Sequence, residues 1–218
     1  MVKIGILGGT FNPIHLGHLR AAEEVREKLD FEKVIFIPCG IPPHRPVDEL
    51  VSFPHRYQMV NLAIADNPYF YVSKIEGIRD GKSYTVDTLK LLLQKEKDAE
   101  FYFILGLDAF LGIDTWKSPQ TLFKLAHFVV IPRKSFTKEQ ILPILNKFFS
   151  DVKTEEDSFF LPSGKIIYYC PITLLNISAS QIRRLVRENK SIRYLVPKVV
   201  EEYIQRFNFY RGGDEKKD

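Results

Sequence analysis

Short apolar runs alternate with amphipathic helical segments over the first two thirds of the chain, and this alternation restricts the fold more than any other feature. The runs are rich in β-branched and aromatic side chains, as expected of strands that are buried on both faces. They are residues 2–7, 34–37, 70–75, 101–105 and 127–131. In the intervals between these runs, apolar side chains recur with the spacing of a helix. The helical segments are residues 17–29, 55–65 and 85–95.

Strand–helix–strand units of this kind connect parallel strands, with the helices packed on the faces of the sheet. The sequence therefore predicts an α/β fold, Rossmann-like and doubly wound, with a mostly parallel sheet and helices on both faces. A small helical part is expected at the C-terminus. We expect one domain over residues 1–211, followed by a frayed tail of glycine and charged residues at 212–218.

The last third of the chain has a less regular pattern. A helix, a polar and acidic surface loop, a strand and two closing helices are expected there. These elements are residues 137–149, 150–158, 165–170, 182–188 and 197–207. Thr137 and Gln140 have the spacing of a capping box, which would open the first of these helices.

Composition excludes several classes of protein. Of the 218 residues, 45% are hydrophobic and 27% are charged, which is typical of a globular domain and not of a disordered, collagen-like or disulfide-rich chain. The net charge is +4, but the lysines and arginines are interspersed with acidic residues and form no basic aromatic stripe. This pattern argues against a nucleic-acid binder.

The sequence also bears on where the protein works. Cys39 and Cys170 are far apart and belong to no Cys-x-x-Cys pair, so we expect free core thiols in a reducing compartment. No apolar run approaches the roughly 18 residues of a membrane span. The N-terminal run leads straight into Gly8 and Gly9 without a cleavage site for a signal peptide. We therefore expect a cytoplasmic protein with no membrane partner.

The segment after the first strand is the most informative candidate site. In an open parallel sheet, the turn at the carboxyl end of a strand is where ligands bind. Gly8 and Gly9 would let the backbone approach a ligand closely, and Thr10 would add a hydroxyl group. His15 and His18 fall on one face of the next helix, beside an N-terminus that favours phosphate. The segment matches neither the G-x-G-x-x-G pattern nor the P-loop.

The two histidines allow three interpretations. They could ligate a metal ion, although no third ligand lies nearby in the sequence. They could be ordinary capping or packing residues. They could also donate hydrogen bonds to a polyphosphate, which is the interpretation that best suits the glycines beside them.

Two motifs resemble those of the nucleotidyltransferase superfamily. His-Leu-Gly-His at residues 15–18, after Gly-Gly-Thr-Phe-Asn-Pro, resembles its H-x-G-H signature. Ile-Ser-Ala-Ser-Gln-Ile-Arg at residues 177–183 resembles its I-S-S-T-x-[IV]-R motif, with Ala179 and Ser180 where serine and threonine are usual. Asn12 likewise replaces a common aspartate in the first loop, a change that some members share.

Further segments resemble one family within that superfamily, the bacterial nicotinate mononucleotide adenylyltransferases. They are Pro-Pro-His-Arg at 42–45, Ser-Tyr-Thr-Val-Asp-Thr-Leu at 83–89, and Gly-Leu-Asp at 106–108 followed by Trp116. The resemblance extends to about Tyr210. It implies transfer of AMP from ATP to nicotinate mononucleotide, which gives deamido-NAD and pyrophosphate in NAD biosynthesis. It also implies Mg²⁺ bound through the ATP phosphates, with no protein ligand for the metal.

The resemblance assigns catalytic roles to His15, His18 and Arg183. The attacking phosphate of the mononucleotide is already an anion, so no protein nucleophile is needed, and alignment and charge stabilisation must accelerate the reaction. The residues expected to contact ATP are Gly8, Gly9, Thr10, Phe11, His15, His18, Arg45, Gly106, Asp108, Ile177, Ser178, Ser180 and Arg183. Three of these have simpler alternatives, because Ser178 and Ser180 could merely start a helix and Arg45 could be a solvated charge.

The resemblance places the mononucleotide against four other residues, Tyr84, Thr85, Trp116 and Arg133. Trp116 would stack on the pyridine ring, although a lone tryptophan also serves as a packing residue. Backbone N–H groups of Tyr84 and Thr85, at a helix start, would receive the pyridine carboxylate.

Other functions remain open from the sequence. The acceptor could be nicotinamide mononucleotide or phosphopantetheine, and the chain could instead be a nucleotide-binding module without activity. A homodimer is the default expectation for the assembly.

Overall fold

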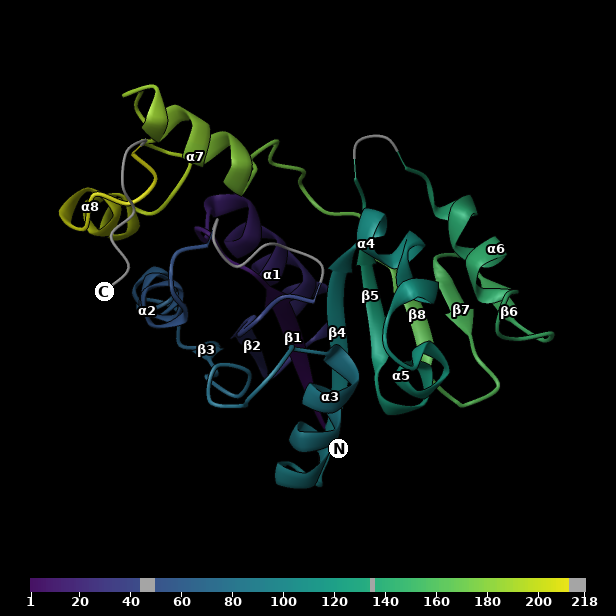
Figure 1. The fold of residues 1–218 in the computed structure, drawn as a ribbon. Helices are drawn as coiled ribbons and strands as arrows, with labels where there is room; N and C mark the ends of the chain where they lie inside the picture. The colour runs from purple at the N-terminus through teal and green to yellow at the C-terminus, as the bar shows by residue number, and fades with distance from the viewer. Residues whose placement is uncertain (44–49, 134–135, 212–218) are drawn as a thin grey trace.

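The computed structural model describes residues 1–43, 50–133 and 136–211 (Figure 1). Arg45 and the expected tail at 212–218 therefore lie outside the described residues. The strands are β1 (Val2–Gly9), β2 (Lys33–Pro38), β3 (Phe70–Val72), β4 (Ala99–Gly106), β5 (His127–Ile131), β6 (Lys153–Glu155), β7 (Ser158–Phe160) and β8 (Ile166–Tyr169). The helices are α1 (Leu16–Leu29), α2 (Phe53–Ala63), α3 (Thr85–Lys95), α4 (Leu107–Leu111), α5 (Pro119–Leu125), α6 (Ile141–Leu145), α7 (Ala179–Arg187) and α8 (Lys198–Arg206). Short 3₁₀ turns lie at Ile113–Thr115 and Lys138–Gln140.

Within the described residues the strands form one eight-stranded sheet in the order β3-β2-β1-β4-β5-β8-β7-β6. The pairs from β3 to β8 are parallel, and β7 and β6 add an antiparallel hairpin at one edge. The predicted fold class is confirmed. The strand order reverses between β1 and β4, because the chain builds β2 and β3 on one side of β1 and returns to the other side. Such a reversal opens a crevice at the carboxyl ends of these strands.

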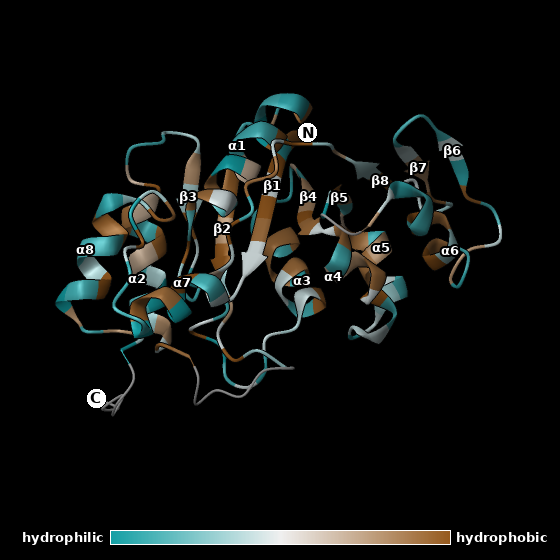
Figure 2. Ribbon diagram, turned by 90° about the horizontal axis from the view of Figure 1, so that it is seen from above, coloured by the Kyte–Doolittle hydropathy of each residue, from teal (hydrophilic) through white to brown (hydrophobic). Residues whose placement is uncertain are grey.

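Two apolar clusters fill the two faces of the sheet. One packs Val25 of α1, Met59 of α2 and Ile204 of α8 against the sheet. The other packs Leu89 of α3 and Phe123 of α5 against the opposite face. Figure 1 shows α2, α7 and α8 gathered on one side of the molecule and α4, α5 and α6 on the other. In Figure 2, β1 and β2 are mostly brown while the helices alternate brown and teal, as expected of buried strands and amphipathic helices.

Residues 150–158 lie at the surface as expected, but the expectation of a loop there is wrong. Lys153–Glu155 and Ser158–Phe160 pair as strands β6 and β7, and Phe159 is buried against the second cluster. Strands of three residues are too short to show a period of two, and the side chains of β6 are all exposed. Their conformation is decided by the pairing of β7 with β8 and of β6 with β7, which the local sequence does not encode.

Other helices also differ from the prediction, for similar reasons. The predicted helix at 137–149 is a 3₁₀ turn followed by the five-residue α6, although the capping box of Thr137 and Gln140 is confirmed. Helices α4 and α5 were not predicted, because segments of five and seven residues give little periodicity. Both cysteines are free, but Cys39 is only half-buried, so it is not the core residue that we expected.

No helix in the described ranges combines the length and the apolar character that a membrane span needs.

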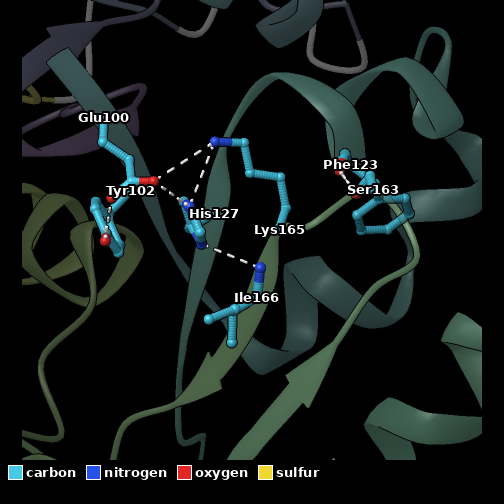
Figure 3. A network of polar contacts seen from close by, with 7 residues as sticks. All are labelled: Glu100, Tyr102, Phe123, His127, Ser163, Lys165 and Ile166. Atoms are coloured by element: carbon cyan, nitrogen blue, oxygen red, sulfur yellow. Dashed lines mark hydrogen bonds and ion pairs between the residues drawn. The ribbon is translucent and has the colours of Figure 1, made fainter. Parts of the chain in front are cut away.

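A buried polar network joins three strands at the end of the sheet that the crevice does not occupy (Figure 3). The Glu100 carboxylate lies 2.9 Å from His127 Nε2 and accepts a hydrogen bond from the Tyr102 hydroxyl at 2.8 Å. The backbone N–H of Ile166 donates to His127 Nδ1 at 3.1 Å. Because Nδ1 accepts, the ring proton lies on Nε2 and points at Glu100. Lys165 lies 3.8 Å from the same carboxylate and keeps the network charge-balanced.

This network predicts how stability depends on pH. Burial lowers the pKa of His127, and the hydrogen bond to Glu100 only partly offsets that effect. The unfolded chain, with a histidine pKa of about 6.5, therefore takes up the proton first. Stability is complete above that value and falls as the pH drops below it. Below pH 6.5, protonation of His127 lowers the free energy of unfolding by up to about 1.4 kcal/mol per pH unit. Replacing His127 with Gln should remove this contribution.

The measurement is urea unfolding of both proteins at pH 7.5, 6.5 and 5.5. His15 and His18 have pKa values lowered in the same direction, so a residual fall is expected in the variant. An undiminished fall in His127→Gln would contradict the prediction.

Candidate active site

A cavity of about 450 Å³ opens at the carboxyl ends of β1, β2, β4 and β5. It lies at the reversal of strand order, where open parallel sheets bind ligands. Ten of the predicted site residues line it: Gly8, Gly9, Thr10, His18, Tyr84, Thr85, Gly106, Asp108, Trp116 and Arg133. Segments up to 125 residues apart in the sequence, from Gly8 to Arg133, therefore meet at one crevice.

The remaining predicted residues do not line the cavity. They are Phe11, His15, Ile177, Ser178, Ser180 and Arg183, and Arg45 lies in the part of the chain that the structure does not describe. Arg183 donates to the backbone carbonyl of Asn12 at 2.8 Å, which anchors α7 next to the glycine loop. Ser178 caps α7 by accepting from the Gln181 N–H at 3.2 Å. The capping role of Ser178 is thus confirmed.

His15 and His18 form a stacked pair at the start of α1. Their ring centroids are 3.6 Å apart and the rings are inclined by 21°. The backbone N–H of His15 donates to His18 Nδ1 at 3.2 Å, so His18 carries its proton on Nε2. The edge of Phe11 packs against His18 at 5.1 Å between centroids. His18 thus lines the cavity and carries its ring proton on Nε2.

Both rings are uncharged near neutral pH. Burial, with a smaller contribution from Arg133, lowers the pKa of His15 to about 4. Burial also lowers the pKa of His18 well below its usual value, and His15 and Arg133 act in the same direction. A neutral imidazole still donates one hydrogen bond, and a strongly anionic ligand would favour the protonated form.

The stacked arrangement does not favour metal binding by the two histidines. His18 Nδ1 is occupied by a backbone N–H, and parallel rings do not direct two lone pairs at one point. Over the ranges that the structure describes, no group of three or more His, Cys, Asp or Glu side chains could hold a metal ion.

The opposite wall of the cavity is the start of α3. Tyr84 is the N-cap and Thr85 the first helical residue, and the first N–H groups of a helix lack partners within the helix. Ser83 fixes this corner, because its hydroxyl accepts from the Gly40 N–H at 3.1 Å and its own N–H donates to the Ile41 carbonyl at 2.8 Å. An anion would therefore find unpaired donors and a positive helix end at this wall.

Trp116 is both a packing residue and part of the cavity lining. Its ring meets Phe103 edge-on at 6.1 Å between centroids, and it also lines the cavity. Arg133 and Asp108, on the adjoining wall, form an ion pair at 3.2 Å. A Cβ on Gly106 would collide with Asp108 Oδ1 and lie 2.6 Å from Arg133 Nε, so a side chain at that position would shift both members of the pair.

Arg56 organises the site, and sequence reasoning missed it. Its side chain is 2% exposed and donates to three backbone carbonyls, those of Val51 at 2.8 Å, Thr10 at 2.8 Å and Gly40 at 3.0 Å. These carbonyls belong to the loop after β1, the loop after β2 and the entry to α2. The sequence did contain a signal for its burial, because Arg56 lies three residues before Met59 and shares the buried face of α2 with it.

Other polar side chains on the lining were also missed, among them Cys39, Glu76, Thr88 and Lys117. Thr88 donates to Glu76 at 2.7 Å. Burial, helped by nearby Glu76, raises the pKa of Cys39 to about 11, so this cysteine remains a thiol and is not a nucleophile. No sequence pattern distinguishes these residues, since each sits on an element whose orientation depends on the sheet.

The fold and this crevice define a class of protein. Residues 6–185 match the model of the cytidylyltransferase-like family, so the chain is a member of that class of nucleotidyltransferases. Two curated relatives are each named "Probable nicotinate-nucleotide adenylyltransferase". The protein from Geotalea daltonii is 46% identical over 97% of this chain and 100% of its own length. The protein from Geotalea uraniireducens is 47% identical over 96% and 98%. The chain belongs to the nicotinate-nucleotide adenylyltransferase family.

Solved structures agree with the fold. The nicotinic acid mononucleotide adenylyltransferase of Plasmodium falciparum, complexed with NaAD, has a TM-score of 0.76 to this chain at 22% identity. The superposition covers 96% of this chain and 98% of that chain. A second complex of the same protein, with APC, gives a TM-score of 0.75.

The three hydrogen bonds of Arg56 predict a large stability effect. Replacing Arg56 with Met should lower the free energy of unfolding by about 3 kcal/mol, because three buried carbonyls lose their donor. Urea unfolding measures this change. Arg187, exposed on α7, offers a matched control, and Arg187→Met should change stability by less than about 0.5 kcal/mol. Equal effects of the two substitutions would contradict the assigned role.

Proposed function

We propose that this protein transfers AMP from ATP to nicotinate mononucleotide, releasing pyrophosphate and forming deamido-NAD for NAD biosynthesis. The main support is a single cavity that joins the His18 Nε2–H at the start of α1 to the helix start at Thr85. One wall suits a triphosphate and the other suits a second anion. Membership of the family supports the same reaction.

The chemistry requires only positioning and charge stabilisation. An oxygen of the mononucleotide phosphate attacks the α-phosphorus of ATP, the new P–O bond forms, and the bond to the bridging oxygen of the β-phosphate breaks. Pyrophosphate leaves with that electron pair. The unreactive thiol of Cys39 agrees with a direct transfer that has no covalent enzyme intermediate.

In this proposal His18 donates from Nε2 to the α-phosphate oxygen where charge accumulates. The backbone of Gly8, Gly9 and Thr10 lies along the phosphates, and His15 supports the His18 ring by stacking. Arg183 and Arg45 add positive charge to the β- and γ-phosphates. Arg183 would exchange its present bond to the Asn12 carbonyl for one to phosphate.

Magnesium enters with ATP as part of the substrate. The described side chains form no ligand cluster, and the metal would be held by phosphate oxygens and water.

The mononucleotide would lie against α3. The pyridine carboxylate accepts from the N–H groups at Tyr84 and Thr85, and Trp116 stacks on the ring. On the adenosine side, Asp108 accepts from a ribose hydroxyl while it is paired with Arg133.

A cytoplasmic location and a homodimer remain expectations.

The test of this function is pyrophosphate release with MgATP and each of three acceptors, namely nicotinate mononucleotide, nicotinamide mononucleotide and phosphopantetheine. Strong release with the nicotinate compound supports the proposal. Strong release only with another acceptor would retain the phosphate chemistry and overturn the acceptor assignment. ATP binding without release would identify a nucleotide-binding module.

Replacing His18 with Ala should lower kcat by about 10²- to 10³-fold, because one preorganised donor to the developing charge is lost. The same pyrophosphate assay measures this change. Its control is an unfolding transition that remains cooperative, which separates loss of catalysis from loss of fold. A kcat within threefold of the unsubstituted protein would refute the role of His18.

A further inference from the structure

Lys117 follows Trp116 and lines the cavity at the wall proposed for the pyridine ring. Its ammonium lies 2.8 Å from Asp87 Oδ2 and 4.7 Å from the centroid of the Tyr84 ring. Both neighbours belong to the first turn of α3 or its cap. Lys117 therefore connects the segment that contains Trp116 to the helix start where the second anion would bind.

Lys117 pairs with the acidic side chain in the first turn of α3. Asp87 lies in the first turn of α3, close enough to oppose the attraction of the helix N-terminus for an anion. Glu76 is a second carboxylate on the lining, held by the Thr88 hydroxyl at 2.7 Å. If Asp87 were unpaired, its negative charge would face any anionic ligand at this wall, whereas Glu76 has the Arg79 guanidinium beside the Thr88 hydroxyl that holds it.

We propose that Lys117, through its pair with Asp87, is the specificity-determining residue that makes this site prefer a pyridine carboxylate to the neutral carboxamide. The pair cancels the charge of Asp87, so that the N–H groups at Tyr84 and Thr85 attract the carboxylate. The inference rests on the proposed function, because it assumes that the mononucleotide lies against α3.

The exposure of the pair argues against a mainly structural role. The Lys117 side chain is 47% exposed and that of Asp87 is 32% exposed. Exposed ion pairs contribute little to folding, whereas a rim charge still acts on a ligand a few ångströms away. Substitutions at these positions should therefore change substrate choice and leave the fold nearly unchanged.

The experiment compares kcat/KM for nicotinate mononucleotide with kcat/KM for nicotinamide mononucleotide, at saturating MgATP. The ratio of the two values is the readout, since general damage to the enzyme lowers both and leaves the ratio unchanged. The variants are Lys117→Gln, Asp87→Asn and the double variant. Lys90→Gln is the matched control, because Lys90 is exposed on the same helix and does not line the cavity.

Lys117→Gln should lower the acid-to-amide ratio about fivefold, the size expected for one charge near a helix end. Asp87→Asn should raise the ratio, and the double variant should return to within about twofold of the unsubstituted protein. The effect of Lys117→Gln should shrink in 0.5 M KCl, because salt screens a rim charge. Lys90→Gln should leave the ratio unchanged.

Two failures are distinguishable. If the unsubstituted protein releases pyrophosphate with neither mononucleotide, the proposed function fails. If it is active on nicotinate mononucleotide but Lys117→Gln changes the ratio by less than twofold, the assignment of specificity to Lys117 is overturned and the proposed function stands. An equal change in Lys90→Gln would also overturn it, since the effect would then come from net charge alone.

Discussion

The site depends on the hydrogen bonds that the Arg56 guanidinium donates to the backbone. Its three donors bond to backbone carbonyls of three separate loops, at Thr10, Gly40 and Val51. Loop backbone that leaves a sheet has no ladder partner, and a buried carbonyl without a donor is costly. A single planar cation therefore holds the glycine loop, the segment after β2 and the entry to α2 in one geometry.

Asn12 extends this anchoring to the C-terminal part of the chain. Its side-chain oxygen accepts from the Val51 N–H at 3.3 Å and from the Tyr210 hydroxyl at 2.8 Å, and its carbonyl accepts from Arg183. The glycine loop is thus fixed by residues up to 198 positions away. An aspartate at this position would also accept these bonds, so the contacts depend on the side-chain oxygen rather than on the amide nitrogen of Asn12.

The electrostatics of the cavity follow from burial rather than from a high density of charge. Neutral stacked histidines, two helix N-termini and a protonated thiol make a site that favours anions without a strong nucleophile or base. Donors that are already oriented need no reorganisation when charge develops on phosphate. The same walls that bind substrate would therefore stabilise the transition state.

The sequence by itself determined the parallel sheet, the helices α1 and α3, and the loop with His15 and His18, because buried strands, amphipathic helices and glycine turns have local periods and compositions. The tertiary structure alone decided the β6–β7 hairpin, the three carbonyls on Arg56 and the pairing of Lys117 with Asp87. These features depend on contacts between separate segments of the chain, and such contacts leave no local pattern in the sequence. Which predicted residues face the cavity was also decided there, since the reversal of strand order brings Gly8, Thr85, Gly106 and Trp116 to one crevice.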